Sequence, residues 1–63
     1  KYLTAYHIGH WSTIGETYER IRNYKKGHNL RTSDLYIEYD VVNSFIEKNT
    51  DDFVTQIEVE IIQ

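Results

Sequence analysis

Aromatic and acidic side chains are the residues of this 63-residue chain that favour a binding chemistry. Nine residues are aromatic, six of them tyrosine, and Glu38 lies between Tyr36 and Tyr39. A carboxylate among aromatic faces holds a flat or quaternary cation by charge and by cation–π attraction of roughly 0.5–2 kcal/mol per contact. The residues that we predict to bind a ligand are Tyr6, Trp11, Tyr18, Tyr36, Glu38 and Tyr39.

The same residues have a plainer interpretation, in which the tyrosines pack the core and Glu38 is a solvated strand residue. Side chains alternate between the two faces of a strand, so Glu38 and Tyr39 share a face only if a bulge lies between them. If Ile37 packs on a helix, Glu38 points the other way. The sequence leaves open which sheet face carries Glu38.

Other chemistries have weaker support in the sequence. His7 and His10 are three residues apart and His28 is distant, and there is no cysteine. A metal site needs three or four converging ligands, which this spacing does not predict. None of the serines lies in a nucleophile-elbow pattern, and there is no glycine-rich phosphate loop. We therefore predict no enzyme activity, no catalytic residue, no metal and no cofactor.

Length and charge limit the possible classes of protein. A chain of 63 residues is at most one domain, here residues 1–63, and it is marginally stable unless stapled or paired. The net charge of −3 divides into +4 over residues 1–31 and −7 over residues 32–63. An acidic domain lacks the basic footprint that DNA contact needs, so we predict no direct nucleic-acid contact by this segment. No apolar run is long enough to predict a membrane span.

The first half of the chain predicts one strand and one helix. Aromatic and β-branched residues are frequent over residues 2–8, and Gly9 ends this strand where the backbone needs a special angle or a close approach. Thr13 is then a predicted N-cap, with Glu16 completing a capping box, and Gly27 is the predicted C-cap. Gly15, in the first turn of the helix, predicts a close approach by a strand backbone or by a ligand.

Two kinds of side-chain contact are expected on this helix. We expect a surface ion pair between Glu16 and Arg20, and another between Glu19 and Arg22. The apolar stripe of the helix, at helical spacing, consists of Ile14, Tyr18, Ile21 and Lys25, with Tyr24 beside it.

The second half of the chain predicts two more strands, over residues 34–42 and 53–62, which form a hairpin. Residues 43–52 read either as a loop or as a turn of helix. The predicted fold class is α+β: a β-α-β-β module with a three-stranded antiparallel sheet and one helix on one face. Such a module leaves a sheet edge and part of the helix uncovered, so we expect it to pair with a second copy or with a second module.

Four short segments resemble the GyrI-like effector-binding domains of MerR- and AraC-type bacterial transcription regulators. Residues 7–11 (HIGHW) and 14–18 (IGETY) are similar to the strand-to-helix entry of that family, residues 37–40 (IEYD) to its middle strand and residues 55–59 (TQIEV) to its closing strand. From first to last they span residues 7–59, so the resemblance extends over nearly the whole chain. The chain departs from the family pattern at His10, which replaces a proline, and at Gln56, where some members have glutamate.

The resemblance implies a module that pairs with a second one about a pseudo-two-fold axis and binds its ligand between the two helices. It implies that Trp11 lies at an aromatic pocket position, and that Glu38 lies in a strand from which multidrug-sensing members contact cationic drugs. The chain would then be the C-terminal half of such a domain, from a cytoplasmic regulator. We expect a missing N-terminal module, a linker and a DNA-binding helix-turn-helix to precede Lys1.

The resemblance implies a non-enzymatic sensor of lipophilic small molecules, cations among them. Two alternatives remain open. The module could instead bind a protein, as a gyrase inhibitor does, through its acidic region at residues 51–60. Less strongly, it could be a small hydrolase, which would need an activated tyrosine or glutamate.

Overall fold

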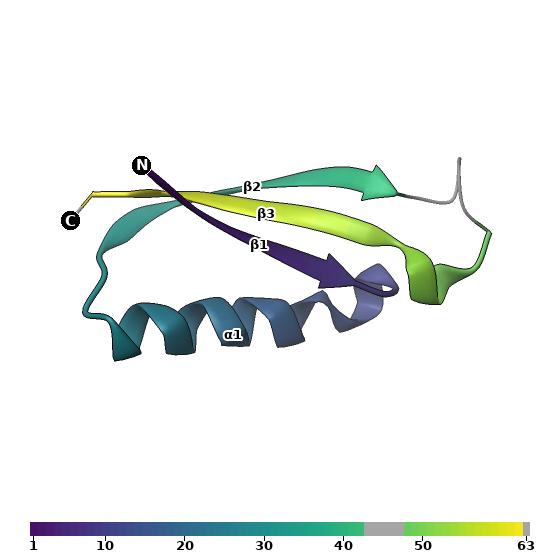
Figure 1. Ribbon diagram of the computed structural model, residues 1–63, viewed down its shortest axis with the longest axis horizontal. Helices are drawn as coiled ribbons and strands as arrows, with labels where there is room; N and C mark the ends of the chain where they lie inside the picture. The colour runs from purple at the N-terminus through teal and green to yellow at the C-terminus, as the bar shows by residue number, and fades with distance from the viewer. Residues whose placement is uncertain (43–47, 63) are drawn as a thin grey trace.

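The computed structural model describes residues 1–42 and 48–62 as one helix packed on a three-stranded sheet (Figure 1). The prediction for residues 43–47, within the ambiguous segment 43–52, lies outside the described residues. The elements are β1 (Tyr2–Ile8), the 3-10 turn η1 (Trp11–Thr13), α1 (Ile14–Gly27), β2 (Thr32–Val42), the 3-10 turn η2 (Thr50–Asp52) and β3 (Val54–Ile61).

The strand order in the sheet is β1-β3-β2, so β3 is the central strand and pairs antiparallel with both neighbours. The sequence-based fold class is therefore confirmed, including the hairpin of β2 and β3 and the placement of helix α1 below the sheet (Figure 1). β2 begins at Thr32, two residues earlier than predicted, and its register with β3 shifts between Thr32 and Tyr36 and again between Asp40 and Val42.

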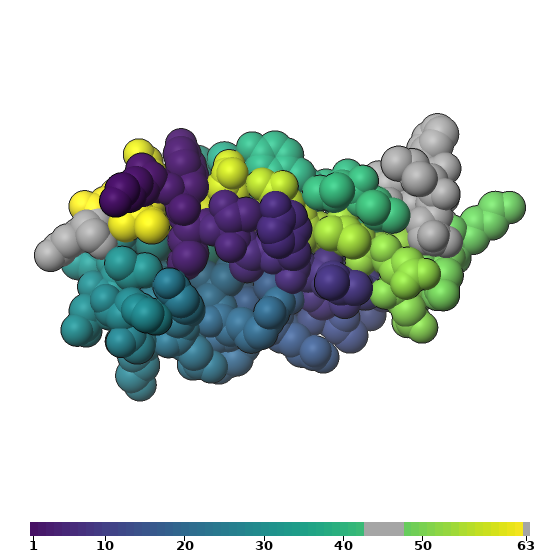
Figure 2. Space-filling model, viewed as in Figure 1, coloured from purple at the N-terminus to yellow at the C-terminus, as the bar shows by residue number. Residues whose placement is uncertain are grey.

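The core lies between β3 and α1 because alternate residues of β3 point toward the helix. Phe53, Ile57 and Val59 are buried, and Ile21 reaches them from the middle of α1. The predicted helical stripe is confirmed in outline, since Ile21 is buried and its other members are half-buried. Figure 2 shows β1 and α1 packed against each other along the front of the molecule, so that β1 covers one side of this core.

The start of α1 differs from the predicted capping box. Thr13 is the N-cap residue, but its side chain does not cap the helix. Its hydroxyl instead donates to the His10 carbonyl oxygen (2.9 Å) and lies 3.0 Å from His7 Nε2. The capping function falls to His10, whose Nδ1 accepts from the Ser12 backbone N–H at the start of η1. A tertiary contact has thus replaced the local one.

The three glycines have different roles from those expected, except for Gly9. Gly9 has φ +126°, a backbone angle that side chains rarely adopt, and this confirms the predicted special angle. At Gly15 an added Cβ would meet no protein atom within 4 Å, so the predicted close approach of a strand backbone is wrong. Gly27 is the last helical residue rather than the cap, and the left-handed turn after α1 is made by Asn29 at φ 53°.

The two faces of the sheet differ in how they are covered. The inner face packs on α1, while the outer face is open in the described part of the molecule. Exposed large side chains lie on that outer face by strand alternation: Tyr2, Tyr6, Ile8, Leu35, Ile37 and Tyr39. The outer face thus exposes more large apolar side chains than the core buries, and it is the surface from which a ligand or partner would remove most apolar area.

Candidate functional site

The six residues predicted to bind a ligand fall into three separate places in the structure. Tyr18, Tyr36 and Glu38 meet on the helix side of β2. Tyr6 and Tyr39 lie on the outer face of the sheet, and Trp11 lies at one end of the molecule. The predicted residues therefore do not form a single site.

The inner cluster, which we define as Tyr18, Lys25, Tyr36 and Glu38, joins α1 to β2. The Tyr18 hydroxyl donates to a Glu38 carboxylate oxygen, and its ring meets the Tyr36 ring edge to face at 5.5 Å between centroids. Lys25 Nζ donates to the Tyr36 hydroxyl at 3.1 Å and lies 5.7 Å from the centre of its ring. The cluster therefore already contains its own cation over an aromatic face.

The proton of Tyr18 is held firmly in this arrangement. Burial, the hydrogen bond to Glu38, the charge of Glu38 and the neighbouring Tyr36 together raise the pKa of Tyr18 to about 12. A neutral phenol that donates to a carboxylate is favoured over its anion by all four effects. An incoming cation would have to displace Lys25 from Tyr36 and Tyr18 from Glu38, so the inner cluster is better suited to joining elements than to binding a ligand.

The outer cluster, which we define as Tyr6, Tyr39, Gln56 and Glu58, is open by comparison. Tyr6 and Tyr39 are both in register with Gln56 of the central strand, on opposite sides of it. Their side chains are 52% and 45% exposed. Because neighbouring strands lie about 4.8 Å apart, the Cα atoms of the two tyrosines are separated by about 10 Å across Gln56. That spacing leaves room for a flat group between or across the two rings.

Glu58 supplies the negative charge of the outer cluster. Its carboxylate accepts from the Tyr39 hydroxyl at 3.4 Å and from Gln56 Nε2 at 3.5 Å, so it is held on the Tyr39 side of the outer cluster. Neither Glu58 nor Gln56 is among the residues that the sequence predicts to bind a ligand. Period-2 alternation puts Glu58 and Gln56 on one face of their strand, but only the register with β2 brings them to Tyr39.

Trp11 contacts neither cluster in the described structure. Its ring lies 5.2 Å from that of buried Phe53 and 5.5 Å from that of His10, centre to centre. Trp11 therefore closes the end of the core next to β3 and is not part of either cluster. Its fluorescence reports on that end of the molecule.

His7 is the buried polar centre of the β1–α1 junction. It is 4% exposed, with Nδ1 2.8 Å from Thr17 Oγ1 and Nε2 3.0 Å from the His10 carbonyl oxygen. A carbonyl only accepts, so Nε2 carries the proton and donates. Arg20 Nη2 donates to Thr17 Oγ1 at 3.1 Å, so the Thr17 hydroxyl proton is directed at His7 Nδ1. Both ring nitrogens are used within the fold.

The described residues hold neither a group of metal ligands nor a membrane-spanning helix. Over residues 1–42 and 48–62, no three His, Cys, Asp or Glu side chains gather as metal ligands do. In the part of the chain that the structure describes, no helix has the length and apolarity that crossing a membrane requires.

Comparison of the chain with models of known protein families, with curated proteins and with solved structures finds no match.

Proposed function

We propose that the chain is an effector-binding module of a bacterial transcription regulator and that it takes a flat, lipophilic cation on the outer face of its sheet. The observation that supports this most directly is the row Tyr6–Gln56–Tyr39 with Glu58 beside it. The motifs similar to GyrI-like domains support the same class of protein. A regulator of this class acts where its DNA is, so we propose a cytoplasmic location.

The outer cluster combines the three interactions that a flat cation uses. The Tyr6 and Tyr39 rings offer stacking surface, Gln56 forms the floor between them, and Glu58 offers charge. A cation–π contact at an exposed site contributes roughly 0.5–1 kcal/mol. Two such contacts with modest apolar burial correspond to binding in the millimolar range, where 1 mM equals about −4.1 kcal/mol.

Tighter binding would need a second surface over the ligand. We propose that a second copy, or an N-terminal module of the same parent protein, supplies it. The exposed apolar side chains around the outer cluster support this, since a partner on the outer face would bury them together with the ligand.

The experiment is a titration with N-methylacridinium, followed by the NMR signals of Tyr6, Tyr39 and Gln56, with neutral acridine as the uncharged probe. We expect those signals to move together, and Glu58→Gln to weaken binding of the cation by about three- to tenfold while leaving acridine unaffected. Glu60→Gln is the matched control, because Glu60 is on the same strand face and pairs with Tyr2 instead.

Two results would contradict this assignment. Saturable cation binding that is indifferent to Glu58→Gln would remove the charge role from the outer cluster. Loss of binding in Glu38→Gln instead would return the site to the inner cluster, on the other face of the sheet.

Protein binding is a second candidate, and the wide apolar surface of the outer face favours it. Leu35 and Ile8 are about 70% exposed and lie outside the outer cluster. A polypeptide spread over this face should be captured without any small molecule, and Leu35→Glu should abolish capture. The hydrolase alternative has less support, because a nucleophilic phenol needs a lowered pKa and that of Tyr18 is raised.

A further inference from the structure

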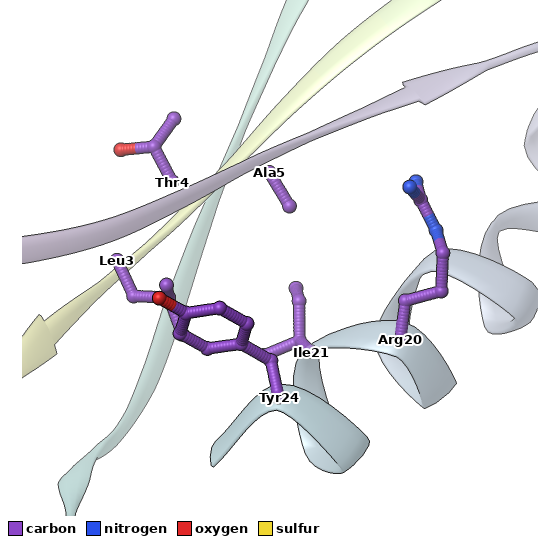
Figure 3. Close-up of a pocket in the computed structure, with 6 residues that line it drawn as sticks. All are labelled: Leu3, Thr4, Ala5, Arg20, Ile21 and Tyr24. Atoms are coloured by element: carbon purple, nitrogen blue, oxygen red, sulfur yellow. The ribbon is translucent and has the colours of Figure 1, made fainter. Parts of the chain in front are cut away.

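A groove between β1 and α1 is separate from both clusters. Its volume is about 300 Å³, and it lies on the helix side of the sheet. Figure 3 shows Ile21 and the Tyr24 ring rising from α1 toward the strand, and the Arg20 side chain standing beside them. The groove is lined by Leu3, Thr4, Ala5, Arg20, Ile21 and Tyr24.

The groove has an apolar floor. Leu3 and Ala5 are half-buried on the inner side of β1, and Ile21 is buried beneath them. The Tyr24 ring, 48% exposed, forms one wall. A volume of about 300 Å³ is at the small end of ligand pockets, so the floor suits a compact apolar group.

Arg20 brings a positive charge to the other end of the groove. Its Nη2 donates to the Tyr6 carbonyl oxygen at 2.9 Å and to Thr17 Oγ1 at 3.1 Å, so the guanidinium is fixed in place. The expected ion pair with Glu16 is not formed, and among the described residues the one salt bridge joins Arg22 to Glu19. A guanidinium has five N–H donors, so donors remain while its charge has no carboxylate partner.

The free edge of β1 adds backbone donors beside Arg20. Gly9 N donates to Phe53 O, and Ile61 N donates to Lys1 O, so the odd-numbered residues of this strand face β3. The N–H groups of Thr4 and Tyr6 therefore point off the edge of the sheet, on the side where Arg20 reaches Tyr6. An anion there would meet charged and neutral donors together.

We propose that this groove binds a small amphipathic carboxylate. Its apolar body would lie on Leu3, Ala5 and Ile21, and its carboxylate would accept from the unused N–H groups of Arg20 and from the edge backbone. Arginine binds carboxylates with directed, charge-assisted hydrogen bonds, which explains a guanidinium fixed at the end of an apolar floor. The ligand has the opposite charge to that proposed for the outer cluster, so the two sites are chemically distinct.

The test is a titration of the wild-type chain with hexanoate, with hexanol and hexylammonium as probes of the same length. Hexanoate should shift the amide signals of Ala5, Arg20 and Ile21 in a saturable way, at least about tenfold more tightly than either control probe. Equal binding of hexanol would overturn the charge role, and no saturable shift by hexanoate at millimolar concentration would overturn the site. Neither result depends on a variant.

Variants then test the role of Arg20. Arg20→Gln should lose hexanoate binding by about tenfold or more, Arg20→Lys should lose less, and Arg22→Gln should bind as wild type because Arg22 pairs with Glu19. Ala5→Leu should block the floor while keeping the charge. Unchanged binding in a folded Arg20→Gln variant would overturn the proposal.

Discussion

Helix α1 is joined to both edge strands of the sheet by polar side chains, and the two junctions differ in burial. Toward β1, His7 and Thr17 are almost inaccessible and are hydrogen-bonded to each other. Toward β2, Tyr18 donates to Glu38 and Lys25 to Tyr36, in contacts that reach solvent. The same helix is thus held by a buried junction on one side and an exposed junction on the other.

The difference in burial predicts a difference in energetic importance. Removing one partner of a buried hydrogen bond leaves the other without water to replace it, and this costs about 1–3 kcal/mol. Exposed polar groups regain water when their contact is broken, and even an exposed pair of opposite charges contributes only about 0–1 kcal/mol. The β1 junction should therefore hold the fold together, whereas the β2 junction can be altered with little loss of stability.

The largest expected effect follows from removing the buried ring. His7→Ala deletes a side chain that fills the junction and makes hydrogen bonds at both nitrogens, so we expect the free energy of unfolding to fall by about 3 kcal/mol. Urea denaturation measures this change. His28→Ala is the control, since His28 is exposed and only stacks on Tyr24, and its loss should be under about 1 kcal/mol. Equal losses would remove the distinction between the junctions.

A smaller effect is expected from deleting a single hydroxyl. Thr17→Val leaves His7 Nδ1 without its partner and should cost about 2 kcal/mol. Thr55 is the matched comparison, because its hydroxyl is equally buried and has no hydrogen-bond partner in the described structure. Thr55→Val should therefore stabilise the fold by about 1 kcal/mol. Thermal unfolding of both variants measures the two changes in stability. Changes in the same direction would contradict the hydrogen-bond assignment.

At the exposed junction, a substitution should change the pKa of Tyr18 more than it changes the stability of the fold. Glu38→Gln should change the free energy of unfolding by less than about 1 kcal/mol. It should also lower the pKa of Tyr18 from about 12 toward its ordinary value of 10, because the carboxylate is one of the causes that raise it. Tyrosinate absorbance measures the shift. Glu60→Gln should leave the pKa of Tyr18 unchanged, and an unchanged pKa in Glu38→Gln would show that the Glu38 carboxylate does not contribute to raising it.

The smallest effect is a dependence of stability on alkaline pH. The pKa of Tyr18 is about 12 in the folded state against 10 in the unfolded state, so the neutral phenol favours folding. Its contribution is fully present below pH 10 and is lost as the pH rises through 12. Tyr18→Phe should show a shallower loss of stability over that range than wild type. Identical slopes would contradict a raised pKa.

Most of the fold was predictable because it depends on local periodicity. The alternation in residues 2–8 and 53–62 and the helical spacing around Ile21 predicted the strands, the helix and its buried side. Local contacts were predicted less well where a tertiary partner competes for them. The Thr13 hydroxyl contacts His10 and His7 instead of capping α1. The Arg20 guanidinium donates to Tyr6 and Thr17 instead of pairing with Glu16.

The candidate site was only partly predictable, because it depends on register between strands distant in sequence. Alternation places Glu38 and Tyr39 on opposite faces of the sheet, as expected for a strand without a bulge between them. It could not show that Tyr6 and Tyr39 would both be in register with Gln56, or that Glu58 would reach Tyr39. Aromatic composition thus predicted which residue types would be important, and strand register decided which of them meet.

The central position of β3 has a consequence for how the chain acquires its shape. Within residues 1–42 and 48–62, β1 and β2 make no ladder with each other, and each pairs with β3, which follows them in sequence. During synthesis on the ribosome, neither edge strand has its partner until β3 has emerged. Until then the nascent chain contains two unpaired strand segments and a helix that is marginally stable by itself. Folding therefore depends on contacts between residues distant in sequence, which are slow to form.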